Sequence, residues 1–119
     1  MSHGMPAGTS ISTAWRIATL TDNTANTLVH ASTAWPLAST ASVSLEFTSK
    51  RGNNVLAGRF TIVMDTATGA IRADLVDTAA TGVTFAVAVN GVSLELRYTT
   101  TATGVGATMS FRETSRVVF

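Results

Sequence analysis

The sequence predicts an all-β protein: a single antiparallel β-sandwich or barrel of about seven to nine strands. Short stretches of alternating apolar and polar residues follow one another, turn residues separate them, and no window has helical periodicity. A chain of 119 residues fits one domain, which we expect to span 11–119. The opening MSHGMPAGTS has no periodicity, so we expect 1–10 to be a flexible arm or a tag remnant.

Small neutral side chains dominate the composition. The chain has 21 Thr, 18 Ala and 11 Ser, 13% charged residues and a formal net charge of +1. Thr favours strands because its β-branch restricts χ1. So little charge gives no electrostatic footprint for nucleic acid or a membrane, so neither is an expected partner. Because charges usually guard exposed edges, we expect this chain to cover its surface by assembling with copies of itself.

Three kinds of chemistry and targeting have no support in the sequence. Cysteine is absent, which excludes disulfides and thiolate chemistry. No apolar stretch approaches the roughly 20 residues that cross a bilayer. The N-terminus lacks a charged region followed by an apolar one, so no export signal is expected.

Alternation first appears in ISTAWRIATL, and it predicts the first strand. Its pattern puts Trp15 and Ile17 on one side, which we expect to be the core side. The polar stretch 21–42 reads as a long connection with one short strand near 28–30. Pro36 argues against regular pairing at Trp35, because proline cannot donate to a ladder.

Clearer strand signals begin at Val43. VSLEFTSKRG alternates, GRFTIVMD follows SKRGNNVLA, and the loop DTATG joins that strand to AIRADLV. After TAATG comes a hairpin, then the loop TTTATGVG and the strand ATMSFRE, with RVVF as a short last strand. The strands from Val43 to the end of AIRADLV indicate a meander.

The hairpin VTFAVAVNGVSLELRYTTT contains an Asn-Gly pair, the strongest short-range hairpin signal. With Asn90-Gly91 as the turn, apolar residues share one face and polar residues the other. The expected cross-strand pairs are Val89 with Val92, Val87 with Leu94, Phe85 with Leu96 and Val83 with Tyr98. The apolar face is made for a core, and no catalytic group lies in the hairpin.

The candidate chemical groups favour structural interpretations. Glu46 and Glu95 each lie between two large apolar residues, so we expect both on solvated faces. His30 lies in an irregular segment with no nucleophile elbow. The sequence therefore predicts no catalytic, cofactor-binding or metal-ligating residue. Trp35 and His30 are the candidates for a partner contact, Trp35 with a core position as the alternative.

The stretch TAATGVTFAVAVNGVSLELRYTTTATGVGATMSFR, residues 78–112, resembles a β-rich structural module of tailed-phage virions, found in tail-fibre-like and capsid-decoration-like proteins. VSLEFTSKRGNNVLAGRFTIVMD, residues 43–65, is similar to the same module. The resemblance implies a non-catalytic role on the outer surface of the particle. It also implies a homo-oligomer, with a trimer favoured, and docking to other virion proteins.

Two classes of function follow. In the first, the chain is a virion structural protein, namely a small decoration, head-fibre or tail-associated component. In the second, a tryptophan in the first strand followed by a meander resembles, more loosely, lipocalin-like barrels, which implies a carrier of a small apolar ligand.

Overall fold

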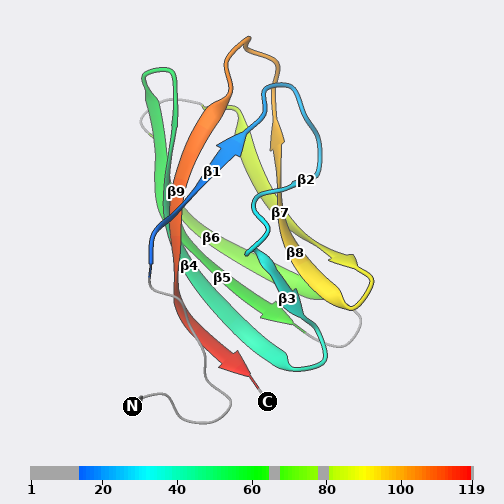
Figure 1. Ribbon diagram of the computed structural model, residues 1–119. Coiled ribbons are helices and arrows are strands. Elements are labelled where there is room, and N and C mark those ends of the chain that lie inside the picture. Colours follow the sequence, from blue (N-terminus) through cyan, green and yellow to red (C-terminus); the bar gives the residue numbers. More distant parts are fainter. Residues whose placement is uncertain (1–13, 65–67, 78–80, 119) are drawn as a thin grey trace.

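The computed structural model describes residues 14–64, 68–77 and 81–118. Within these ranges the chain is all-β and contains nine strands (Figure 1). The predicted arm at 1–10 and the start of the predicted first strand lie outside the described residues. No helix in the described part is long and apolar enough to cross a membrane.

The nine strands form two packed sheets and are numbered here in chain order. The first four are β1 (Arg16–Leu20), β2 (Thr27–Leu28), β3 (Ala34–Pro36) and β4 (Thr40–Arg51). The others are β5 (Asn54–Met64), β6 (Gly69–Asp77), β7 (Val83–Asn90), β8 (Ser93–Thr100) and β9 (Ala107–Val118). The all-β antiparallel prediction is confirmed, and of its two alternatives, sandwich or barrel, the structure is consistent with the sandwich.

The larger sheet has five strands in the order β1-β9-β4-β5-β6, and every pairing in it is antiparallel. Its central hairpin is tighter than the sequence predicted, because β4 and β5 stay paired up to Arg51 and Asn54. The turn is Gly52-Asn53, and Gly52 has a φ of +61°, which a side chain would disfavour. One register shift between β4 and β9 falls between Ser44 and Leu45.

The smaller sheet is built around β8. On one side β8 pairs with β7, and on the other it pairs with β2 and β3. The expectation that Pro36 prevents pairing at Trp35 is wrong, since Trp35 pairs with Leu94 and Pro36 with Ser93. Strand β3 lies at the sheet edge, where a missing N–H breaks no ladder.

The β7–β8 hairpin has the predicted faces but a different register. Its turn is Gly91-Val92, so Val89 pairs with Leu94 and Val87 with Leu96. Gly91 has a φ of +61° and Val92 is not in the positive-φ region, as a type II′ turn requires. The partner strand is displaced by two residues, and a displacement by two leaves every side chain on its predicted face.

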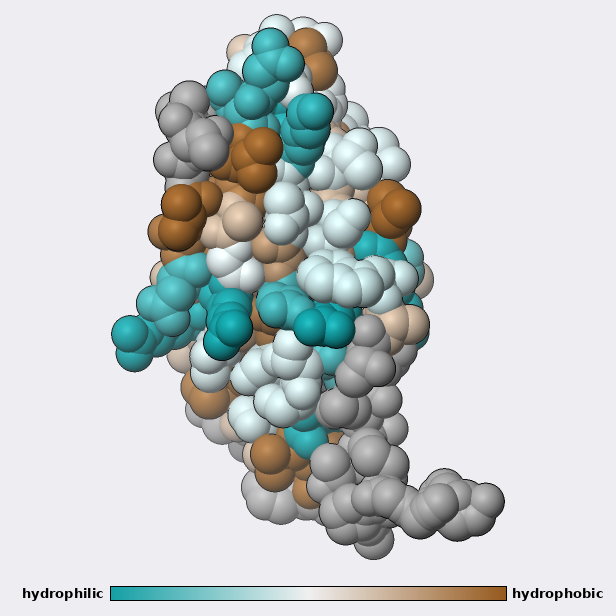
Figure 2. Space-filling model, turned by 90° about the vertical axis from the view of Figure 1, so that its left-hand side faces the viewer, coloured by the Kyte–Doolittle hydropathy of each residue, from teal (hydrophilic) through white to brown (hydrophobic). Residues whose placement is uncertain are grey.

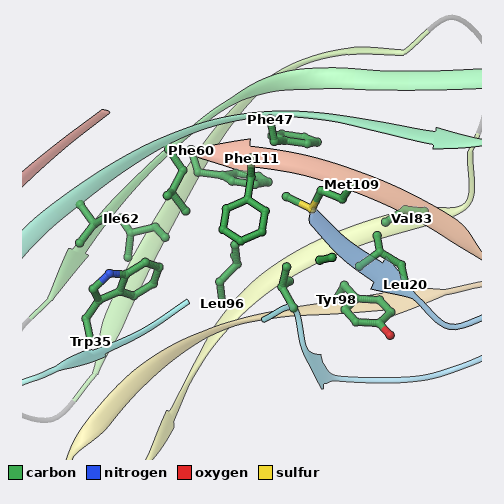
Figure 3. Close-up of a cluster of buried hydrophobic side chains, with 14 of the residues drawn as sticks. Leu20, Trp35, Phe47, Phe60, Ile62, Val83, Leu96, Tyr98, Met109 and Phe111 are labelled. Atoms are coloured by element: carbon green, nitrogen blue, oxygen red, sulfur yellow. The ribbon is translucent and has the colours of Figure 1, made fainter. Parts of the chain in front are cut away.

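The core lies between the two sheets, and large side chains from both fill it (Figure 3). Trp35, Phe60 and Phe111 are the largest side chains that are almost fully buried. The tip of the hairpin lies outside this core, because Val89 is 41% and Val92 is 81% exposed. On β8 the core reaches as far as Leu94, which is 1% exposed, whereas its partner Val89 on β7 is outside it.

Three phenylalanine rings join the two sheets. Phe47 of β4 and Phe60 of β5 are stacked with centroids 4.5 Å apart. Phe85 of β7 meets both rings edge-on, at 5.3 Å and 4.9 Å. Such aromatic pairs add stabilisation beyond the area they bury.

Replacing Phe85 with alanine is expected to lower the free energy of unfolding by about 3 kcal/mol, the low end for such a truncation because Phe85 is only partly buried. The urea midpoint measures this. The matched control is Val92→Ala on the same hairpin, which we expect to change stability by less than about 0.5 kcal/mol. Equal effects of the two variants would contradict the placement of Phe85 against the core.

Candidate interaction surface

The outer face of the five-stranded sheet points away from the core, and no other strand among the described residues covers it (Figure 1). Alternation sends Val43, Leu45 and Phe47 of β4 into the core, so the residues between them point outward. Figure 2 shows this face, mostly pale, with a hydrophilic band across its middle and apolar side chains on both sides of the band. Five exposed large apolar side chains lie here, Trp15, Ile17, Val63, Val76 and Val117.

Four outward side chains of alternating charge form one row across this face. Arg112 of β9 pairs in register with Glu46 of β4, Glu46 with Arg59 of β5, and Arg59 with Asp74 of β6. The carboxylate of Glu46 accepts a hydrogen bond from Nε of Arg112. Arg59 is exposed, and the Asp74 side chain is 70% exposed and lies 3.7 Å from Nε of Arg72. We call these four residues the charge row.

Trp15 extends the charge row at the β1 edge. Its ring lies under the guanidinium of Arg112, which is 4.9 Å from the ring centroid, a cation–π contact. The expectation that Trp15 and Ile17 face the core is wrong, since they are 53% and 66% exposed. Ala18 and Leu20 are buried instead. Both alternating sets of β1 contain apolar residues, so alternation alone did not decide between them.

Trp35, expected as a partner contact or a core residue, is a core residue with 1% exposure. Its Nε1 donates a hydrogen bond of 3.0 Å to Oε1 of Glu113, which β9 contributes from the opposite sheet. Glu113 is 4% exposed and also accepts from Nε and Nη2 of Arg116, at 2.9 Å and 2.7 Å. The buried indole N–H and carboxylate are thus satisfied, and Trp35 is unavailable to a partner.

His30, the other expected partner contact, is half-buried. Its ring meets Phe111 edge-on with centroids 5.4 Å apart. Its Nδ1 accepts from the backbone N–H of Ser32 at 3.0 Å and lies 2.8 Å from the hydroxyl of the same residue. This side chain shapes the turn between β2 and β3.

Glu95 was expected on a solvated face, but it is only 8% exposed. It does point outward from β8, yet Arg97 and Asn90 cover it. Nε and Nη2 of Arg97 donate to its Oε1 at 3.0 Å and 2.6 Å, and Nδ2 of Asn90 donates to its Oε2 at 3.1 Å. The carboxylate serves to hold the hairpin tip.

Arg51 connects three loops at one end of the sandwich, and the side chain is 4% exposed. Its Nη2 donates to Oδ1 of Asp22 and to the carbonyl of Thr101, at 2.5 Å and 2.6 Å. Its Nη1 donates to the carbonyl of Thr81 and its Nε to that of Val105, both at 2.9 Å. A hollow of about 340 Å³ opens beside this cluster.

The Asp22 carboxylate should give stability that depends on pH. The backbone N–H of Thr103 lowers the pKa of Asp22 below 3.8, and the N–H of Gly104 and Arg51 act in the same direction against partial desolvation. Since the folded pKa is the lower one, the contribution is complete above the unfolded pKa of 3.8 and is lost as pH falls through the folded pKa.

We therefore expect the gap in urea midpoint between wild type and Asp22→Asn to stay constant from about pH 7 to pH 5 and to narrow below about pH 4. Other carboxylates are present in both proteins, so they largely cancel. A gap that persists down to about pH 2 would show that the charge of Asp22 does not stabilise the fold.

The described acidic side chains of the candidate surface and the core are held in pairs with arginine or tryptophan. Across 14–64, 68–77 and 81–118, no three His, Asp or Glu side chains lie close enough together to hold a metal ion.

The sequence pattern missed both the charge row and the Arg51 cluster. The registers of the β4–β5 and β5–β6 hairpins could have revealed that Arg59 lies between Glu46 and Asp74, but Arg112 and the partners of Arg51 come from distant segments. Comparison with known families, curated proteins and solved structures finds no match, and no family is assigned to the chain.

Proposed function

We propose that this chain is a non-catalytic structural protein that acts by self-association and docking through the outer face of its five-stranded sheet. The observation that carries the proposal is the exposure of that face, where Trp15, Ile17, Val63, Val76 and Val117 are 49–72% exposed. Exposed apolar side chains that share one face are typical of surfaces that bind another protein.

The use of the carboxylates supports the same role. Asp22, Glu95 and Glu113 hold loops, a hairpin tip and a buried tryptophan. A catalytic carboxylate is instead expected to converge with a second group on an accessible cleft. The net charge of +1 argues against nucleic acid or an anionic membrane as the partner.

We further propose the outer surface of a tailed-phage virion as its location, as a decoration, head-fibre or tail-associated component. The support is the resemblance of 43–65 and 78–112 to the virion module. The alternative of a small-molecule carrier has less support, because the rings of Trp35, Phe60 and Phe111 fill the space between the sheets that a ligand would occupy.

Light scattering over a range of concentrations tests the self-association. We expect a mass that is a multiple of the 12.3 kDa chain. A single-chain mass at every concentration, together with uptake of an apolar fluorescent probe, would contradict the proposal and favour the carrier. Location is tested separately: we expect the gene to lie among capsid and tail genes, and the chain to copurify with particles at a fixed copy number.

A further inference from the structure

We infer that two copies of this chain pair through the outer faces of their five-stranded sheets, about a two-fold axis that runs parallel to the strands between β4 and β5. This inference rests on the proposed self-association and names its partner, a second copy, and its contact surface. The observation that selects the axis is the order of charges along the charge row.

From β9 to β6 the charge row carries positive, negative, positive and negative side chains. If a second copy of the row is laid against the first in the opposite direction, every positive charge lies opposite a negative charge. The two-fold axis reverses the row, so Arg112 of β9 lies opposite Asp74 of the second copy. Glu46 of β4 then lies opposite Arg59 of the second copy. Both contacts occur twice, as an isologous interface requires.

A second two-fold axis is possible in the plane between the two sheets, and it runs along the charge row. It places each residue of the row opposite the same residue of the second copy. Arg112 would then face Arg112 and Glu46 would face Glu46, and like charges across an interface cost several kcal/mol. The charge order therefore favours pairing about the axis parallel to the strands.

Two other outward charges, Lys50 and Arg72, and the exposed Val76 fit the same axis. Lys50 of β4 lies opposite Val55 of β5 in the second copy, and Arg72 of β6 lies opposite Ser115 of β9, so neither meets a like charge. Exposed Val76 of β6 lies opposite Ser110 of the second copy, one strand away from Ile17 of that copy. The apolar edges of the two sheets thus come together at the rim.

The face is large enough for a stable pair. Ten residues of β4, from Ser42 to Arg51, are paired with β5, a length of about 33 Å at roughly 3.3 Å per residue. Four strands about 4.8 Å apart give a width of about 15–20 Å. The projected area is on the order of 500 Å² per copy, which side-chain relief brings towards the ~800 Å² per partner of a standard interface.

Charge reversal tests the pairing by sedimentation velocity and native mass spectrometry. Arg59→Glu is expected to weaken association at least tenfold, because it sets two carboxylates against each other at both symmetric contacts. The matched control is Lys50→Glu, which makes the same change of charge on the same face and is expected to weaken association less than threefold. Circular dichroism checks that both variants are folded.

Reversal of the whole row provides the rescue. The variant Arg112→Glu/Glu46→Arg/Arg59→Glu/Asp74→Arg keeps opposite charges next to each other within the chain and is expected to pair with itself as wild type does. Mixed with wild type, it is expected to form less than a tenth of the statistical fraction of mixed pairs. A wild type that stays a single chain overturns both this inference and the proposed function. If the wild type associates but Arg59→Glu does not weaken the association, this inference alone is overturned. The same holds if the wild type forms mixed pairs freely with the variant whose whole charge row is reversed. A mass three times that of one chain favours the trimer.

Discussion

Replacing Arg51 with methionine is expected to lower the free energy of unfolding by about 3–5 kcal/mol, because three loop carbonyls lose their donor and each buried acceptor left unpaired costs roughly 1–3 kcal/mol. Methionine keeps much of the stem volume but removes every donor. The carbonyls of Thr81, Thr101 and Val105 then lose their partner, and Asp22 loses its counter-charge. These groups belong to three different loops, so the loss should also loosen that end of the sandwich.

The urea midpoint measures this loss, and Lys50→Met is the matched control, since Lys50 precedes Arg51 on β4 and is exposed. We expect the control to change stability by about 0.5 kcal/mol or less. Arg51→Lys should fall between the two, because an ammonium keeps the charge but cannot reach all four acceptors. Equal midpoints for Arg51→Met and Lys50→Met would mean that the loops are held without Arg51.

Replacing Trp35 with alanine should be about as damaging, with an expected loss of 3–5 kcal/mol, roughly the cost of truncating a buried tryptophan. The side chain is 1% exposed and fills the space between β3 and β9. Its loss leaves a cavity and removes a donor to the buried carboxylate of Glu113. Trp35→Phe restores most of the volume without the N–H, so the difference between the two variants separates packing from the hydrogen bond.

Trp15→Ala is the control for this series, because Trp15 is 53% exposed. We expect it to cost about 1 kcal/mol or less, mainly from the contact with Arg112. Tryptophan fluorescence gives a second test. The Trp35→Phe variant retains only the exposed Trp15, and the Trp15→Phe variant retains only the buried Trp35. A polar quencher should therefore reduce the fluorescence of Trp35→Phe more strongly than that of Trp15→Phe. A larger stability loss for Trp15→Ala than for Trp35→Ala would show that the assignment of the two tryptophans is reversed.

Much of the sandwich is predictable because side chains alternate strictly along strands. The faces of β4, β7 and β8 follow from this alternation, and the β7–β8 faces are right even though the turn is Gly91-Val92. Alternation fails where both sets of a strand contain apolar residues. In β1, Ala18 and Leu20 are buried because they lie opposite Met109 and Ala107 of β9, which belong to a distant part of the sequence.

The candidate surface was harder to predict for the same reason. The Glu46–Arg59 and Arg59–Asp74 neighbours come from the consecutive β4–β5 and β5–β6 hairpins, whereas Arg112 reaches the row through the β4–β9 pairing. The Trp35–Glu113 bond joins residues 78 positions apart, and Pro36 concealed the pairing of β3. Sequence patterns report the period of a strand but not which distant strand lies beside it.

The claim that the outer face of the five-stranded sheet contacts a second copy can be tested most directly by cross-linking. The chain has no cysteine, so a single introduced thiol is unique. Thr61 is exposed on β5 beside the proposed axis, and Thr84 is exposed on β7 in the other sheet. With a short thiol-specific cross-linker, we expect Thr61→Cys to give a covalent pair at twice the mass of one chain and Thr84→Cys to stay single. Cross-linking at Thr84→Cys alone, or equal cross-linking of the two variants, would contradict the claim.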